Sequence, residues 1–295
     1  MTAVANRWVL GARPRTLPAA VVPVVVGTAC AAGEVDIIGW RAVAALVAAV
    51  GIQVGTNYAN DYSDGKRGTD DPAGRVGPPR LVGSGLASPR AVFWAAMAAF
   101  MVAGTAGLAL AIAVDLRVLL VGAGSFAAGW LYTGGPKPYG YAGFGELFVF
   151  AFFGVVATVG SAYVQLERIT ALAIGASVPV GLLATALLVV NNVRDIPSDT
   201  AAGKRTLAVR LGDRATRVLY VALLVGAVVC VPLVGGLGSR PAAALALIAI
   251  PFAQRPLVTV LGGKTGRDLI PALAGTGRVQ LVFGTLFALG LWLGA

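Results

Sequence analysis

The sequence lacks histidine altogether and has few cysteines and few charged side chains. Catalysis by histidine is therefore excluded. The two cysteines, Cys30 and Cys230, lie far apart in apolar segments, which excludes a zinc cluster and argues against a disulfide framework. Charged residues form 12% of the 295 residues, about half of their share in soluble domains, whereas hydrophobic residues form 57%. These proportions exclude a soluble enzyme and a disordered protein, and the mean hydropathy of +0.82 indicates an integral membrane protein.

Long apolar segments fill most of the chain. A helix needs roughly 20 apolar residues to cross the hydrocarbon core of a bilayer. The segments predict a single all-α membrane domain over residues 1–295, a bundle in which two weakly repeated halves, about 17–132 and 144–260, precede a ninth helix. The nine expected transmembrane spans are 17–33, 41–60, 90–114, 117–132, 144–165, 169–191, 215–236, 240–260 and 278–295.

The distribution of basic residues predicts the orientation of these spans. With the N-terminus in the cytoplasm, 19 of the 23 Lys and Arg residues fall on the cytoplasmic side and four on the other side. Cytoplasmic loops of membrane proteins carry such an excess. We therefore expect a cytoplasmic N-terminus, an outside C-terminus and a multi-pass protein of a bacterial cell membrane. The net charge of +10 is explained by these loops and does not indicate a nucleic-acid partner.

The end of the second span carries a first cluster of polar residues. Asn57, Asp61 and Asp64 are spaced i, i+4 and i+7, so they share one helical face. Gly65-Lys66-Arg67 follows directly. An acidic residue at membrane depth is costly and indicates a functional role, although Asn and Asp also occur at helix ends for structural reasons.

A second cluster lies 134 residues later, at the end of the sixth span. Asn191 and Asp195 share one helical face, and we expect Pro197 to end the helix, which places Asp199 on the following turn. Gly203-Lys-Arg follows, as in the first cluster. We interpret the two clusters as half-sites that face each other across the bundle on the cytoplasmic side.

The combined composition of the clusters predicts a site for magnesium and a diphosphate. Mg²⁺ prefers oxygen ligands and is usually held by one or two carboxylates and substrate phosphates. Basic residues nearby would bind the remaining phosphate oxygens. The expected metal ligands are Asp61, Asp64, Asp195, Asp199, Asn57 and Asn191.

Other polar residues near the clusters are candidates for substrate contact. Arg80 lies in a Gly- and Pro-rich loop that could cover a phosphate or be a solvated connection, and Lys137 could reach a phosphate or only determine topology. Arg15 could contact an anion or anchor the chain at the interface. The full expected substrate-binding set is Gln53, Asn60, Lys66, Arg80, Tyr132, Asn191, Lys204 and Arg15. Phe148, Phe150, Phe152 and Phe153 would line a lipid-tail groove or face lipid.

Three segments carry a resemblance to a known family. They are 53–64, which reads Gln-Val-Gly-Thr-Asn-Tyr-Ala-Asn-Asp-Tyr-Ser-Asp, then Tyr-Thr-Gly-Gly-Pro at 132–136, and 191–207 with the second Asp pair. The paired Asp clusters resemble the UbiA superfamily of intramembrane aromatic prenyltransferases. All three segments resemble its menaquinone branch, and the Tyr-Thr-Gly-Gly-Pro stretch and the close of the second cluster carry that assignment. Where the ubiquinone branch has a further Asp, this chain has Gly68, which leaves open whether Asp70 or Asp71 reaches a metal.

The resemblance covers nearly the whole chain and implies nine helices, a site facing the cytoplasm and Mg²⁺ as cofactor. The implied enzyme transfers a polyprenyl group from polyprenyl diphosphate to 1,4-dihydroxy-2-naphthoate, with release of diphosphate and CO₂, and gives demethylmenaquinone. Catalysis would fall to the four Asp residues of the clusters, to Asn57 and to Lys137. The alternatives are another aromatic acceptor (4-hydroxybenzoate, homogentisate or haem), a phosphatidyltransferase, whose signature Asp61-Tyr-Ser-Asp64-Gly65 imitates in part, and a transporter with acidic residues at the membrane midplane.

Overall fold

The computed structural model describes residues 2–69, 76–77 and 79–295, and this part of the chain contains helices and no β-strand. Asp70 and Asp71 lie outside the described residues, so their reach to a metal stays untested. The α-helices are α1 (Thr2–Ala12), α2 (Pro18–Cys30), α3 (Gly39–Arg67), α4 (Pro89–Ala113), α5 (Val118–Leu131), α6 (Gly145–Val149), α7 (Ala157–Leu166), α8 (Ala171–Ala201), α9 (Leu207–Leu211), α10 (Asp213–Leu237), α11 (Ile250–Leu261) and α12 (Ile270–Leu293). A π-helical segment, Phe150–Val156, joins α6 to α7.

Each expected span has a helix at its place in the described chain. Seven helical runs are long and apolar enough to cross a membrane, and α2 adds an eighth if it is counted together with α1, from which it is bent by 50°. The remaining expected span corresponds to α5, which is apolar but shorter, with 14 residues. Nine crossings with the N-terminus in the cytoplasm therefore stay a prediction, as does the division into two repeated halves.

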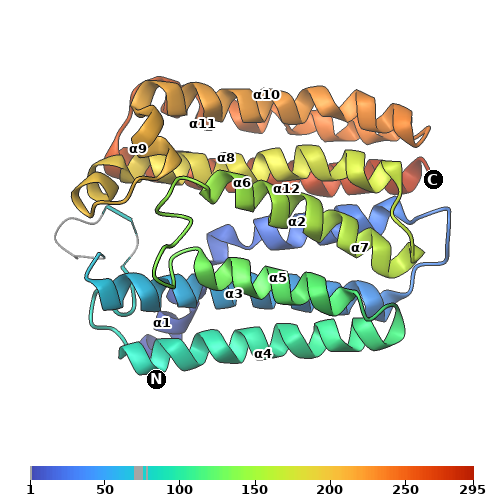
Figure 1. The fold of residues 1–295 in the computed structure, drawn as a ribbon. Coiled ribbons are helices and arrows are strands. Elements are labelled where there is room, and N and C mark those ends of the chain that lie inside the picture. Colours follow the sequence, from blue (N-terminus) through green and yellow to red (C-terminus); the bar gives the residue numbers. More distant parts are fainter. Residues whose placement is uncertain (1, 70–75, 78) are drawn as a thin grey trace.

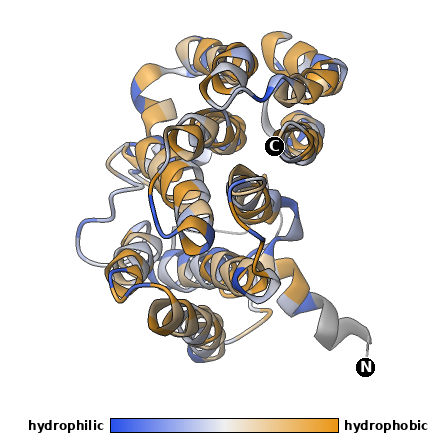
Figure 2. Cartoon of the chain, turned by 90° about the vertical axis from the view of Figure 1, so that its right-hand side faces the viewer, coloured by the Kyte–Doolittle hydropathy of each residue, from blue (hydrophilic) through white to orange (hydrophobic). Residues whose placement is uncertain are grey.

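The helices lie side by side along one direction (Figure 1). Helices α3, α4 and α5 pack on one another, and α8, α10, α11 and α12 form a second group, with α2 and α7 in contact with both groups. Large apolar side chains such as Met101, Ile112, Leu120 and Leu233 point outward and are exposed. Hydrophobic residues cover the helices and hydrophilic residues gather in the connections (Figure 2), as expected for a surface in contact with lipid.

Small residues let the helices approach closely, as is common in membrane proteins. A β-carbon added to Gly154 in the π-helical segment would lie 2.5 Å from the Cα atom of Gly181 in α8. On α3, a β-carbon at Gly51 would lie 3.0 Å from the carbonyl oxygen of Ala99 in α4. These contacts hold the two long helices α3 and α8 in the positions that build the cavity described below.

The prediction that Pro197 ends the second cluster's helix was wrong, because α8 continues through Pro197 to Ala201. Proline removes a single backbone donor, the one that would bond to the carbonyl four residues earlier, and the other helical hydrogen bonds continue past it. Hydroxyl groups near the proline bond to other carbonyls of the helix. Ser198 Oγ donates to the carbonyl of Asp195 at 3.0 Å, and Thr200 Oγ1 donates to that of Ile196 at 2.8 Å. Asp199 is therefore on the helix, two turns after Asn191 and on about the same face.

Candidate active site

A cavity of about 1730 Å³ runs along the inside of the bundle. At one end it is lined by the ends of α3 and α8, and at the other by residues such as Ala45, Arg117 and Tyr163. Between Ala45 and Asp64 the helix α3 rises by about 28 Å, at 1.5 Å per residue, so the cavity extends over most of the length of a membrane-spanning helix. The polar side chains gather at the α3 and α8 end: Asn57, Asn60, Asp61, Asp64, Asn191, Asn192, Asp195 and Asp199 line it.

The first cluster lies on one face of α3, as its spacing predicted. Asn57, Asp61 and Asp64 are all buried and all line the cavity. Both carboxylate oxygens of Asp61 accept backbone N–H groups, from Leu81 at 2.9 Å and Val82 at 3.1 Å. Asp61 therefore fixes the loop that follows the first cluster and holds the neighbouring Arg80 at the cavity wall.

Asp64 is the carboxylate with the most positive surroundings. Its Oδ2 atom lies 3.5 Å from Lys204 Nζ and 3.8 Å from Arg80 Nη2. The hydroxyl group of Tyr141 donates a short hydrogen bond to its Oδ1 atom. Burial and the nearby charge of Asp64 raise the pKa of Tyr141, so this hydroxyl keeps its proton and remains a donor at neutral pH.

The second cluster supplies the opposite wall of the same cavity end. Asp195 accepts two hydrogen bonds from the guanidinium of Arg194, at 2.8 and 2.6 Å. Asp199 lies 4.0 Å from Lys204 Nζ, the ammonium that also contacts Asp64. The expectation that the two clusters face each other is met, since one lysine touches a carboxylate from each.

These residues fit a hard divalent cation by the chemistry of their donors. All the candidate ligands at this cavity end are carboxylate or amide oxygens, which Mg²⁺ prefers. The position of Lys204 indicates that a single positive charge can be shared by both clusters. Within the described chain, no three His, Cys, Asp or Glu side chains converge on one point. A metal here would thus depend on carboxylates from the clusters together with substrate oxygens.

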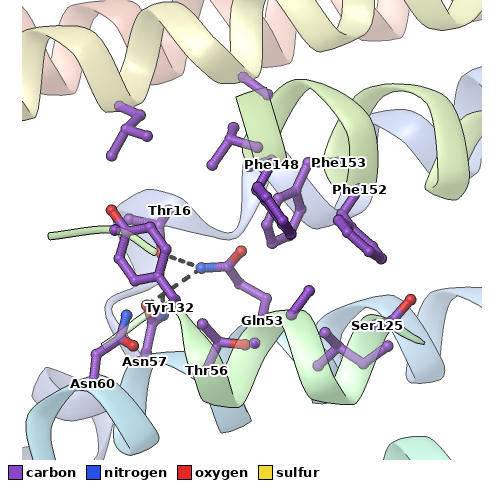
Figure 3. A pocket seen from close by; sticks show the side chains of 18 of the residues that line it. Thr16, Gln53, Thr56, Asn57, Asn60, Ser125, Tyr132, Phe148, Phe152 and Phe153 are labelled. Atoms are coloured by element: carbon purple, nitrogen blue, oxygen red, sulfur yellow. Dashed lines mark hydrogen bonds between the residues drawn. The ribbon is translucent and has the colours of Figure 1, made fainter. Parts of the chain in front are cut away.

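Gln53, Asn60 and Tyr132 line the cavity beside the first cluster, as expected for substrate contact (Figure 3). Gln53 Nε2 donates to Thr16 Oγ1 at 3.2 Å and to Asn57 Oδ1 at 3.3 Å, which links α3 to the segment before α2. Asn60 Oδ1 accepts the hydroxyl of Thr133 at 2.8 Å. Arg15 and Asn191 also line the cavity, although the side chain of Arg15 is exposed.

Two lysines that were expected to contact phosphate do not reach the cavity. Lys66 and Lys137 are exposed and do not line it. Lys66 follows Asp64 by two residues, which turns it about 200° away on a helix, and its ammonium lies 5.6 Å from the ring of Tyr62. Arg67, and not Lys137, lines the cavity. Its guanidinium donates hydrogen bonds to the backbone carbonyls of Thr133 and Gly135. Phosphate contact by these lysines stays a prediction that the geometry does not favour.

Sequence reasoning missed Arg194 and Tyr141 as site residues. Arg194 is 3% exposed, lines the cavity, and its Nη1 atom has no hydrogen-bond partner among the described residues. It directly precedes Asp195 in the cluster, but its spacing does not reveal that its side chain turns back to that carboxylate. Tyr141 lies 77 positions from Asp64 and has no motif that could have identified it.

The aromatic residues of the α6–α7 region divide between the cavity and the helix packing. Phe148, Phe152 and Phe153 line the cavity (Figure 3), whereas the ring of Phe150 lies against Gly181 of α8. The ring of Phe148 stacks on Tyr139, with centroids 3.9 Å apart, and lies 6.0 Å from Phe152. Beyond the polar end, toward the middle of the cavity, the wall is therefore aromatic and apolar and suits a hydrocarbon tail.

The loop held by Asp61 provides a test of this geometry. In Asp61→Asn, one side-chain oxygen becomes an NH₂ group that faces a backbone N–H, so a buried donor loses its partner. Hydrogen bonds to charged groups contribute about 1.5–3 kcal/mol. We expect a lower melting temperature in detergent and faster trypsin cleavage after Arg80. The control is Asp268→Asn at an exposed position; equal melting and cleavage in both variants would contradict the anchoring role.

Comparisons with known proteins show the family of this chain. A model of the UbiA prenyltransferase family matches residues 20–261. The chain is 50% identical to a Mycobacterium tuberculosis protein named 1,4-dihydroxy-2-naphthoate octaprenyltransferase, over 96% of this chain and 95% of the relative. It is 35% identical to the Escherichia coli protein of the same name, over 97% and 95%. A UbiA homologue from Archaeoglobus fulgidus, bound to GPP and Mg²⁺, has a similar fold with a TM-score of 0.66, 14% identity and coverage of 97% and 99%. The chain therefore belongs to the UbiA prenyltransferase family.

Proposed function

We propose that this protein transfers a polyprenyl group from polyprenyl diphosphate to 1,4-dihydroxy-2-naphthoate in a Mg²⁺-dependent reaction. The names of its relatives support this acceptor. The observation that carries the proposal is the arrangement of Asp64 and Asp199, one from each cluster, around a shared ammonium at the polar end of a long apolar cavity. Such a cavity suits a substrate with an anionic head and a hydrocarbon tail.

The polar end would hold the diphosphate. The metal ligands would be Asp61, Asp64, Asp195 and Asp199, with help from the amides of Asn57 and Asn191. When bound, Mg²⁺ supplies positive charge for the departing diphosphate. Arg80, Arg194 and Lys204 already lie at the carboxylates and would bind the phosphate oxygens, which strengthens the stabilisation of the leaving group. A homologue of the same fold bound to GPP and Mg²⁺ supports this assignment.

The apolar wall would protect the reactive prenyl group. As the C–O bond breaks, its electron pair leaves with the diphosphate and an allylic cation forms. Phe148 and Phe152 line the cavity beyond the polar end and would hold the adjacent isoprene units. Because these walls exclude water, the cation is not captured by it before the acceptor reacts.

The acceptor would enter beside Gln53, which lies between Asn57 at the polar end and Phe148 of the aromatic wall (Figure 3), and beside Tyr132, which also lines the cavity. Loss of CO₂ implies attack by the ring carbon that carries the carboxylate. That carbon gives an electron pair to the new C–C bond, and the pair from the broken bond to CO₂ returns to the ring. The product would be the quinol form of demethylmenaquinone, because the oxidation state of the ring does not change, and the side chain of Arg15 is available at the cavity for the acceptor's carboxylate.

The proposed setting is a bacterial cell membrane, with nine spans and the polar cavity end on the cytoplasmic side. The excess of basic residues at that end supports this orientation. The ends of α3 and α8 that carry the two clusters, and the connections that follow them, would then face the compartment that provides the soluble acceptor and Mg²⁺.

The experiment that tests the function is a product assay with purified protein in detergent. The reaction contains a polyprenyl diphosphate, Mg²⁺ and either 1,4-dihydroxy-2-naphthoate or 4-hydroxybenzoate, and the lipid extract is analysed by mass spectrometry. We expect a prenylated naphthoquinol from the naphthoate alone, and none after addition of EDTA. A product from 4-hydroxybenzoate alone would show that this compound, and not the naphthoate, is the acceptor. If folded protein gave no product with either acceptor, the proposed function would be refuted.

A carboxylate of the second cluster tests the metal and diphosphate site. In Asp199→Asn, loss of the charge that would hold Mg²⁺ should remove several kcal/mol of transition-state stabilisation, so kcat should fall by about a hundredfold or more. The matched control is Asp36→Asn, at an exposed position outside the cavity, where kcat should be unchanged. Turnover of Asp199→Asn close to that of the wild type would show that this carboxylate has no part in the reaction.

A further inference from the structure

The ammonium of Lys204 lies between the two Asp clusters. Its Nζ atom is 3.5 Å from Asp64 Oδ2, 4.0 Å from Asp199 Oδ1 and 4.7 Å from the ring centre of Tyr141. The side chain is 11% exposed, and those of Asp64 and Asp199 are 3% and 14% exposed. A lysine this well surrounded by carboxylates and an aromatic face is held there by charge, and it neutralises carboxylates that would otherwise repel each other.

The backbone of Lys204 is held by hydrogen bonds, whereas its ammonium is held by the charges around it. Its N–H group donates to the carbonyl of Asp199 at 2.8 Å, and that of Arg205 donates to the carbonyl of Tyr141 at 2.9 Å. The turn before it depends on Gly203, whose φ of 71° lies in the left-handed region that glycine adopts without strain. The flexible four-carbon stem lets the ammonium move by several bond rotations while the residue stays beside the cavity.

A divalent ion held by Asp64 or by Asp199 would lie close to the ammonium of Lys204. Mg²⁺ is held by carboxylate oxygens, and Lys204 Nζ is 3.5 Å from an oxygen of Asp64 and 4.0 Å from one of Asp199. Positive charges that lie this close repel each other strongly in a buried site. The ammonium would therefore oppose binding of the ion as long as it stays at the carboxylates, and a diphosphate would offer it new oxygen partners.

We propose that Lys204 is a resident counter-ion that keeps the affinity for free divalent metal low and couples metal binding to the arrival of the diphosphate. The inference rests on the proposed function, since it takes the diphosphate as the ligand that receives the ammonium. The lysine first screens Asp64 and Asp199 from each other, and it then moves to the phosphate oxygens as the metal replaces it. Metal and prenyl diphosphate therefore bind together, and each increases the affinity for the other by the same factor.

The test is a titration with Mn²⁺, followed by electron paramagnetic resonance, on the full-length protein in detergent without any acceptor. The chain has no histidine, so no imidazole binds Mn²⁺ outside the site once an affinity tag is removed. Wild type and Lys204→Met are titrated alone and with farnesyl diphosphate. Lys204→Arg keeps the charge, and Lys264→Met removes an exposed lysine that does not line the cavity as the matched control.

We expect Lys204→Met alone to bind Mn²⁺ roughly tenfold or more tightly than the wild type, because a unit positive charge near the ion is gone. Lys204→Arg and Lys264→Met should bind like the wild type. Farnesyl diphosphate should tighten Mn²⁺ binding strongly in the wild type and much less in Lys204→Met. Since no acceptor and no turnover are involved, a wild type that binds as expected but forms no prenylated product would refute the proposed function and leave the counter-ion role intact.

Equal or weaker Mn²⁺ binding by folded Lys204→Met, in the absence of diphosphate, would overturn the proposal. The proposal would also be overturned if farnesyl diphosphate increased the affinity for Mn²⁺ by the same factor in Lys204→Met and in the wild type. Folding is checked by gel filtration and melting temperature. If Lys204→Met does not fold, Lys204→Gln, which is neutral but can still donate hydrogen bonds to Asp64, gives the same comparison with the same two outcomes.

Discussion

The charge balance among buried carboxylates is the interaction on which this site depends. A carboxylate taken out of water is strongly destabilising unless a positive or hydrogen-bonding partner compensates it. Each acid at the polar end has such partners: backbone N–H groups for Asp61, Arg194 for Asp195, and Lys204 for Asp64 and Asp199 together. The same cations can bind phosphate oxygens, so the groups that stabilise the folded site also prepare it for an anionic substrate.

Two helices that are longer than a membrane crossing requires provide this arrangement. About 20 residues span the hydrocarbon core, whereas α3 has 29 residues and α8 has 31. The extra turns carry the Asp residues beyond the apolar part of each helix while keeping them on a rigid element. Close contacts at Gly51 and at Gly154 hold α3 and α8 against their neighbours. The charged end and the aromatic wall of Phe148 and Phe152 consequently belong to one continuous cavity.

The sequence predicts the helices and the cavity-facing carboxylates, because both follow from local periodicity. Hydropathy locates the apolar helices, and a spacing of three and four residues places Asn57 and Asp61 on one face, as observed. Contacts set by tertiary packing are not encoded locally. Pro197 was expected to end a helix that in fact continues to Ala201, because proline removes only one hydrogen bond from the helix. Lys137 was expected at the cavity that Arg67 lines instead, and nothing in the sequence connects Tyr141 to the first cluster.

The proposed function requires the diphosphate to bind between α3 and α8, with its tail along the aromatic wall. A structure of the protein with Mg²⁺ and a thiolodiphosphate analogue of a prenyl substrate, in which the bond to the leaving group is not broken, would test this directly. We expect the diphosphate between Asp64 and Asp199, with Lys204 on its oxygens and the first isoprene units against Phe148. A diphosphate at the opposite end of the cavity, near Arg117, would contradict this expectation.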